Sequence, residues 1–196
     1  MDRGLWTNEE LVNMRIISGK YKGRKINFPK SPYIRPTQDR VREALFNVLA
    51  RSISGVNALD LFAGSGAFGI EALSRGAKNV TFVDNNFKCV RIIKENLRNI
   101  DIEDRANILR MDALRAIKKL SKTGNKFDIV FLDPPYYKGL SKKTLISLNQ
   151  YDILSHTNII VAEHFKKDIL PYNIDNMIFF KQKRFGDTVL SFYRKK

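Results

Sequence analysis

Short apolar runs, separated by stretches with helical periodicity, constrain the fold of this chain most strongly. The runs are continuously apolar instead of alternating with polar residues, which is typical of strands buried on both faces of a parallel sheet. Helices between such strands cover the two faces. The predicted strands are 56–62, 79–83, 106–110, 127–132 and 157–162, and the predicted helices are 66–75, 87–99, 114–120 and 142–149. The expected fold class is therefore α/β.

The two ends of the chain depart from this pattern. Segments 177–183 and 188–194 flank Phe185-Gly186-Asp187 with no helix between them, which predicts antiparallel strands joined by a tight turn. Near the other end, 15–19 and 22–26 predict a small hairpin, and a helix is expected over 39–51. We expect a Rossmann-like, mostly parallel seven-stranded sheet that ends in an antiparallel hairpin, with a small N-terminal hairpin and helix extension.

The chain of 196 residues is expected to have three parts. Residues 1–13 differ in character from the rest of the chain and Met14 could be a start codon, so we expect a non-native or disordered leader there. Residues 14–51 form the N-terminal extension and 52–196 the main domain. No run approaches the roughly 18 apolar residues of a membrane span. Cys89 is the only cysteine, which excludes an internal disulfide and a cysteine metal cluster. We expect a cytoplasmic protein with no membrane or metal partner, for which a monomer would suffice.

The positive charge is concentrated at the two ends. The formal net charge is +15, and residues 14–51 hold ten Lys and Arg against two Asp and Glu. Residues 181–196 hold six against one. Such an excess is typical of proteins that bind a polyanion. Nucleic acid is favoured over membrane, because no basic amphipathic helix with bulky apolar residues is evident.

A glycine-rich loop lies between a predicted strand and a predicted helix. Gly64-Ser65-Gly66-Ala67-Phe68-Gly69 is a G-x-G-x-x-G sequence, and Asp84 lies about twenty residues further on, as in the dinucleotide fingerprint. Asp60, just before the glycines, argues against a dinucleotide, because a pyrophosphate at the helix N-terminus would be repelled by a carboxylate. S-adenosylmethionine carries an ammonium, a sulfonium and no phosphate, so it is the favoured cofactor.

Several further residues are expected to contact this cofactor. Asp84 would accept the ribose hydroxyls, and Asp112 the adenine amino group, with a backbone contact from Ala113. Asp112 is equally well placed to cap a helix. Thr37 is expected at the methionine end of the cofactor or at a helix start. The full set is Thr37, Asp60, Phe62, Gly64, Gly66, Asp84, Asp112 and Ala113.

Asp133-Pro134-Pro135-Tyr136 comes directly after the apolar run 127–132. The prolines fix two φ angles and remove two N–H donors, which leaves a stiff loop with carbonyl acceptors. With a carboxylate and an aromatic ring, such a loop can hold a flat ring that bears an amino group. Taken alone, the sequence is also compatible with an ordinary Pro-Pro turn.

These features together give the chain a resemblance to the class I methyltransferases, and specifically to the bacterial family that methylates a guanine N2 of small-subunit (16S) ribosomal RNA. The similarity covers Met14 to the C-terminus, and the N-terminal segments carry most of its specificity. The matching segments are Arg15-Ile16-Ile17-Ser18-Gly19, Gly23-Arg24-Lys25, Arg35-Pro36-Thr37, the run from Arg40 to Asn47, the run from Asp60 to Gly66, and Asp133-Pro134-Pro135-Tyr136. Relatives often have Phe where this chain has Tyr136, and either ring can stack on a base.

The resemblance implies roles for Asp133, Pro134 and Tyr136 in catalysis. Asp133 and the Pro134 carbonyl would each accept one hydrogen of the guanine amine, which turns its lone pair toward the methyl carbon. Tyr136 would stack on a guanine that is unpaired or rotated out of its helix. The substrate would be 16S rRNA or a partly assembled small subunit.

Phosphate contacts are expected from the basic hairpin and the 39–51 helix, which would position the RNA without reading its sequence. Solvated loop charge is the alternative interpretation. The candidates are Lys20, Lys22, Arg24, Lys25 and Arg42.

Three other functions are compatible with the same residues. An adenine-N6 methyltransferase of DNA or RNA uses the same Asp-Pro-Pro-Tyr motif, and only the N-terminal segment argues against it. A protein-glutamine methyltransferase is disfavoured because its motif usually begins with Asn. The third is a non-catalytic RNA-binding or ribosome assembly factor on an inherited fold.

Overall fold

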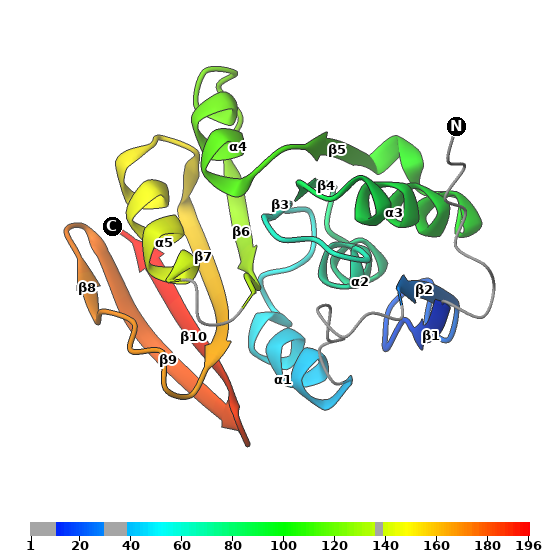
Figure 1. Cartoon of the computed structure of the whole chain (residues 1–196), viewed down its shortest axis with the longest axis horizontal. Coiled ribbons are helices and arrows are strands. Elements are labelled where there is room, and N and C mark those ends of the chain that lie inside the picture. Colours follow the sequence, from blue (N-terminus) through cyan, green and yellow to red (C-terminus); the bar gives the residue numbers. More distant parts are fainter. Residues whose placement is uncertain (1–10, 30–38, 136–138) are drawn as a thin grey trace.

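The computed structural model describes residues 11–29, 39–135 and 139–196. Its centre is an eight-stranded sheet with the strand order β5-β4-β3-β6-β7-β10-β9-β8 (Figure 1). The parallel strands are β3 (Asn57–Asp60), β4 (Asn79–Asp84), β5 (Ala106–Arg110), β6 (Phe127–Leu132) and β7 (Leu154–Phe165). The antiparallel strands are β8 (Asn173–Ile174), β9 (Met177–Phe185) and β10 (Thr188–Lys195). The predicted α/β class is confirmed, and the two-residue β8 adds an eighth strand to the seven expected.

Helices cover both faces of the sheet. The helices α1 (Asp39–Leu49), α2 (Ala67–Ser74) and α3 (Phe87–Asn99) contribute to one apolar cluster, whereas α4 (Ala113–Leu120) and α5 (Leu140–Gln150) contribute to the other. A short 3-10 helix, η2 (Glu103–Arg105), precedes β5. Neighbouring residues of β6 belong to opposite clusters, since Val130 packs with α4 and α5 and Phe131 with the first group. Burial on both faces explains why the strand is continuously apolar.

The strand order places a topological switch point between β3 and β6. From β3 the chain proceeds to β4 and β5 on one side, and then crosses to β6 and β7 on the other. In open parallel sheets, ligands bind outside the carboxyl ends of the strands at such a point. Asp60 ends β3 and pairs with Phe131 of β6, so Asp60 and Asp133 both lie at this edge.

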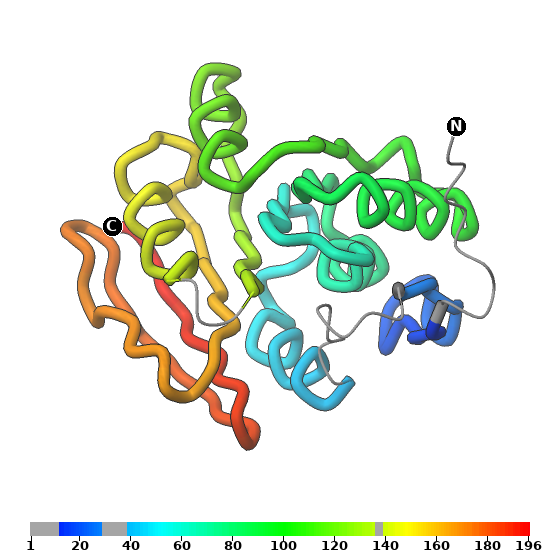
Figure 2. The backbone as a smooth tube through the Cα atoms, in the orientation of Figure 1, coloured from blue at the N-terminus to red at the C-terminus, as the bar shows by residue number. Residues whose placement is uncertain are grey.

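The N-terminal hairpin consists of β1 (Leu11–Arg15) and β2 (Lys25–Pro29), and Figure 2 shows its backbone beside α3. The expected strands 15–19 and 22–26 mostly form the turn instead, because Gly19 and Gly23 adopt φ angles of 86° and 83° that break a strand. Residues 11–13, expected in the leader, pair with β2. The division of the chain at 13/14 and at 51/52 remains a prediction.

Candidate cofactor and active site

The glycine loop between β3 and α2 depends on its glycines for two different reasons. Gly64 and Gly66 have φ angles of 55° and 82°, in the left-handed region that side chains disfavour. Gly69, which already lies in the first turn of α2, is needed for space, since a Cβ there would lie 2.2 Å from the ring of Phe82 in β4. The loop therefore turns sharply, and α2 packs directly against the sheet.

Asp84, the last residue of β4, holds this loop. Its Oδ2 accepts the N–H of Gly64 at 2.9 Å, and its Oδ1 accepts the N–H of Asn86 at 2.8 Å. Burial raises the pKa of Asp84. Each carboxylate oxygen can accept a second hydrogen bond, so this side chain can still accept from a hydroxyl of a ligand.

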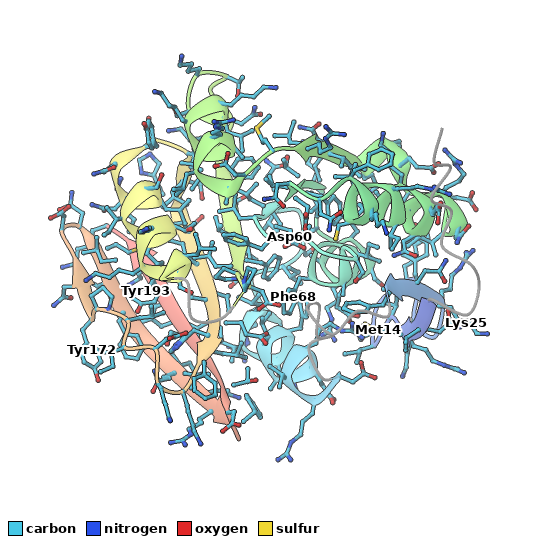
Figure 3. The ribbon with its side chains drawn as sticks, in the orientation of Figure 1. Met14, Lys25, Asp60, Phe68, Tyr172 and Tyr193 are labelled. Carbon is cyan, nitrogen blue, oxygen red and sulfur yellow. The ribbon has the colours of Figure 1, made fainter. Side chains whose placement is uncertain are left out.

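Asp60 is the most unusual carboxylate of the site, and Figure 3 shows it near the middle of the molecule. It is 1% exposed, and its Oδ2 accepts the N–H of Gly69 at 3.2 Å. Among the described residues its Oδ1 is buried without a hydrogen-bond partner, and the backbone N–H of Phe62 is only the weakest of the influences on the pKa of this carboxyl. Burial, followed by the charges of Asp133 and Asp84, raises the pKa of Asp60 to about 7. An unpaired buried oxygen is costly. A ligand that carries positive charge and N–H donors would relieve this cost, so the residues present fit S-adenosylmethionine.

The proline motif begins at the carboxyl end of β6. Asp133 is half-buried, Pro134 is buried and Pro135 is exposed. The charge of Asp133 contributes to the raised pKa of Asp60, which indicates that the two carboxylates share one site. Tyr136 and Thr37 lie outside the described residues, so their expected roles stay predictions.

Asp112 caps α4, the second of the two roles considered for it. Its Oδ1 accepts the N–H of Arg115 at 3.0 Å, and its Oδ2 lies 3.2 Å from Nε of the same arginine. Ala113 is buried in the cluster around α4 and α5, and the half-buried Phe62 packs against that cluster. If Asp112 also contacts the cofactor, its carboxylate must accept hydrogen bonds both from the cofactor and from the N–H of Arg115.

Four of the five expected phosphate ligands are exposed, and the fifth is not. Lys20, Lys22, Arg24 and Lys25 are exposed in or beside the hairpin turn, where Arg24 also donates to the carbonyl of Asn99. Arg42 is fully buried.

The expected phosphate contact of Arg42 is therefore corrected. Its Nη2 donates to the Arg15 carbonyl at 2.6 Å and to Asp39 Oδ1 at 3.0 Å. Burial lowers the pKa of this guanidinium. Arg42 thus connects α1 to the hairpin instead of facing solvent.

The comparisons with known proteins agree with this geometry. Residues 14–194 match the family described as Conserved hypothetical protein 95. The chain is 38% identical over 183 residues to YlbH of Bacillus subtilis (strain 168). This match covers 93% of this chain and 100% of the relative. It is 36% identical over 182 residues to Ribosomal RNA small subunit methyltransferase D of Escherichia coli (strain K12), with 93% and 90% covered. The chain belongs to the family of ribosomal RNA small subunit methyltransferase D.

A solved member from Escherichia coli, yhhF, has the same fold. It superposes with a TM-score of 0.84 at 32% identity, and the match covers 94% of this chain and 99% of that one. The resemblance to the 16S rRNA methyltransferase family is thus confirmed. In residues 11–29, 39–135 and 139–196, no group of three His, Cys, Asp or Glu could hold a metal ion. No helix within these ranges is long and apolar enough to cross a membrane.

Two buried polar residues of this family member were not predicted from the sequence. Glu71, in α2, is fully buried and accepts the N–H groups of Ile17 and Ser18 at 2.8 and 3.0 Å. The one available signal was a glutamate in the middle of the mostly apolar helix Ala67–Ser74.

The second is Asn96 in α3, which is 1% exposed. Its Oδ1 accepts the N–H of Asn27 in β2 at 2.8 Å, and its Nδ2 donates to the carbonyls of Asn27 at 2.9 Å and Ser65 at 3.0 Å. One amide therefore joins the hairpin to the glycine loop. In the sequence it is indistinguishable from the solvated face of an amphipathic helix.

Proposed function

We propose that this protein transfers the methyl group of S-adenosylmethionine to the exocyclic N2 amine of a guanine in 16S ribosomal RNA. The observation that carries the proposal is the buried Oδ1 of Asp60 at the switch point of the sheet, which has no hydrogen-bond partner within the described part of the chain, with Asp133 in the same site. The name of the Escherichia coli relative supports ribosomal RNA as the substrate.

The residues around the glycine loop would hold the cofactor. Asp60 would face its positive charge, Asp84 would accept from its ribose, and Asp112 with the backbone of Ala113 would lie toward the adenine. Phe62, Gly64, Gly66 and Thr37 complete the proposed set. When bound, S-adenosylmethionine supplies an electrophilic methyl group.

The guanine amine is a poor nucleophile because its lone pair is delocalised into the ring. Asp133 and the Pro134 carbonyl would accept its two hydrogens and turn the lone pair toward the methyl carbon. Such positioning can contribute up to about 7–11 kcal/mol in favourable cases. Acceptors fixed where positive charge develops on the nitrogen add electrostatic stabilisation. The surplus proton passes to Asp133 or to water, and Tyr136 would stack on the base.

The exposed basic residues of the hairpin turn would hold the RNA backbone. Lys20, Lys22, Arg24 and Lys25 project from the turn that Glu71 anchors to α2. Phosphate contacts of this kind fix the position of the RNA and leave recognition of the guanine to the active site. The protein is proposed to act as a cytoplasmic monomer on 16S rRNA or on a partly assembled small subunit.

The test is transfer of a tritiated methyl group onto unmodified 16S rRNA and onto small-subunit particles, with nucleoside analysis of the product. We expect N2-methylguanosine as the labelled product. Labelled N6-methyladenosine would assign the site to adenine instead, and an absence of label on both substrates would overturn the proposal. The comparison of rRNA with particles identifies the form that the enzyme uses.

A further inference from the structure

The antiparallel end of the sheet carries positive charge that the proposed function does not use. Strands β9 and β10 contain no Asp or Glu. Their basic residues are Lys181, Lys183, Arg184, Arg194 and Lys195. This is the second of the two basic segments of the chain, and it lies far in sequence from the N-terminal hairpin.

The register of the strands places two of these lysines on one face. Lys181 pairs with Phe192 and Lys183 with Leu190. Directly opposite residues of an antiparallel pair project to the same face. Phe192 and Leu190 pack in the cluster that contains α1, so both lysines lie on the α1 face of the sheet.

A β-bulge brings an aromatic ring to the same place. The register shifts between Phe192 and Tyr193, which leaves Phe180 as the extra residue of β9. Phe180 is 41% exposed, its ring lies 6.2 Å from that of Phe192, and the guanidinium of Arg194 lies 5.8 Å from its centroid. We call Phe180, Lys181, Lys183 and Arg194 the β9 basic face.

This face lies at the same level of the sheet as the active site. Glu163 of β7 is one residue beyond the partner of Leu132, so it is level with Asp133. Leu190 of β10 pairs with Glu163 on one side and with Lys183 on the other. Lys183 is thus level with Asp133 and three strand spacings away, which is about 14 Å. Figure 1 shows α1 between the end of β9 and the N-terminal hairpin.

We propose that the β9 basic face is a second RNA-binding surface, which holds the single-stranded RNA that flanks the target guanine. This inference rests on the proposed function and extends it to a further part of the chain. Lys181, Lys183 and Arg194 would contact phosphates, whose charge they complement. The ring of Phe180 beside a guanidinium provides a stacking surface for an unpaired base. With the hairpin, it gives the RNA a contact on each side of α1.

The experiment compares two triple variants that remove the same charge. One is Lys181→Gln, Lys183→Gln and Arg194→Gln. The control is Lys118→Gln, Lys119→Gln and Lys122→Gln, three exposed lysines at the end of α4. That end of α4 leads into the amino end of β6. The three control lysines therefore lie at the amino ends of the parallel strands, away from the active site at their carboxyl ends. RNA affinity over a range of salt, KM and kcat for rRNA, cofactor affinity and thermal stability are measured for both.

For the β9 triple we expect the KM for rRNA to rise about tenfold or more. The slope of log K against log salt should fall by about 2, since each phosphate contact to a single strand contributes about 0.7. Cofactor affinity and kcat at saturating RNA should be unchanged. Phe180→Leu alone, which keeps the apolar bulk, should weaken binding about tenfold. The control triple should leave the KM nearly unchanged.

Equal effects of the two triples would show that only overall charge matters and would overturn the inference. If neither triple variant has an effect, the inference is overturned too. The β9 lysines would then serve only to keep an exposed strand from pairing with other chains. In both cases a wild-type protein that methylates rRNA leaves the proposed function intact. A wild-type protein that neither binds nor methylates rRNA refutes both.

Discussion

The carboxylate of Glu71 accepts the backbone N–H of Ile17 at 2.8 Å, and this contact fastens the N-terminal hairpin turn to α2. Glu71 also accepts from Nε of Arg75 at 2.7 Å, and the next turn of α2 provides Ser74, whose Oγ donates to the Ser18 carbonyl at 2.6 Å. The same helix begins at the glycine loop. One short helix therefore fixes the proposed RNA-binding turn relative to the proposed cofactor site.

Replacement of Glu71 by Gln should weaken this attachment. The amide removes the charge that pairs with Arg75 and can accept at only one of the two positions that now bind backbone N–H groups. Breaking a buried, hydrogen-bonded ion pair costs about 3–5 kcal/mol, so we expect a loss of this order in the free energy of unfolding by urea. The control is Glu95→Gln, whose half-exposed pair with Arg91 on the surface of α3 contributes about 0.2–0.5 kcal/mol. Equal midpoints for the two variants would contradict the role of Glu71.

The close approach of the turn to α2 should make Gly19 far less replaceable than Gly23. Both have positive φ, which costs a non-glycine residue about 1–2 kcal/mol. A Cβ on Gly19 would also lie 2.0 Å from the carbonyl oxygen of Ser74, whereas a Cβ on Gly23 has nothing within 4 Å. We expect Gly19→Ala to be less stable than Gly23→Ala by a further ~1–3 kcal/mol, as for overpacking. Denaturation of the two variants side by side measures the difference, and equal stabilities would mean that the turn does not rest on α2.

Periodicity predicts the parts of the fold that can be recognised from residues close together in sequence. The run 127–132 and the glycine loop could be recognised because each residue type reflects its own strand or turn. The ends of the two hairpin strands could not be predicted in this way, because they depend on the positive φ angles of two glycines. Arg42 was expected to be exposed, since a charge on an amphipathic helix usually is; its burial depends on a carbonyl 27 residues away. Likewise, nothing near Glu71 in sequence indicates its partners in the turn, 53 and 54 residues distant.

Asp133 should be needed for turnover and not for cofactor binding. Asp133→Ala removes an acceptor that orients the guanine amine, so single-turnover methylation should fall by a factor of about 10²–10⁴. Cofactor affinity, measured by calorimetry without RNA, should stay close to that of the wild type, because Asp60 and Asp84 remain. The Asp133→Asn variant keeps the shape and an acceptor oxygen, and a smaller loss in that variant would separate hydrogen bonding from proton uptake. Unchanged methylation by Asp133→Ala would refute its role.

The pKa of Asp60, raised to about 7 mainly by burial, predicts a pH dependence of cofactor binding. Because the folded protein holds the proton more tightly than the unfolded chain, stability falls as pH rises from about 4 to 7, where the buried carboxyl ionises with no counter-charge from the residues that the structure describes. A cationic ligand prefers the ionised form, so its affinity should rise with pH over the same range. Below pH 7 the affinity for the cofactor should fall by nearly tenfold for each pH unit.

Calorimetric titration of S-adenosylmethionine between about pH 5.5 and 8 measures this affinity, with pH values chosen around the expected midpoint of about 7. Asp60→Asn should bind more weakly at about pH 8 and with little pH dependence, whereas a wild-type affinity that is flat across the range would show that Asp60 does not face the charge of the cofactor.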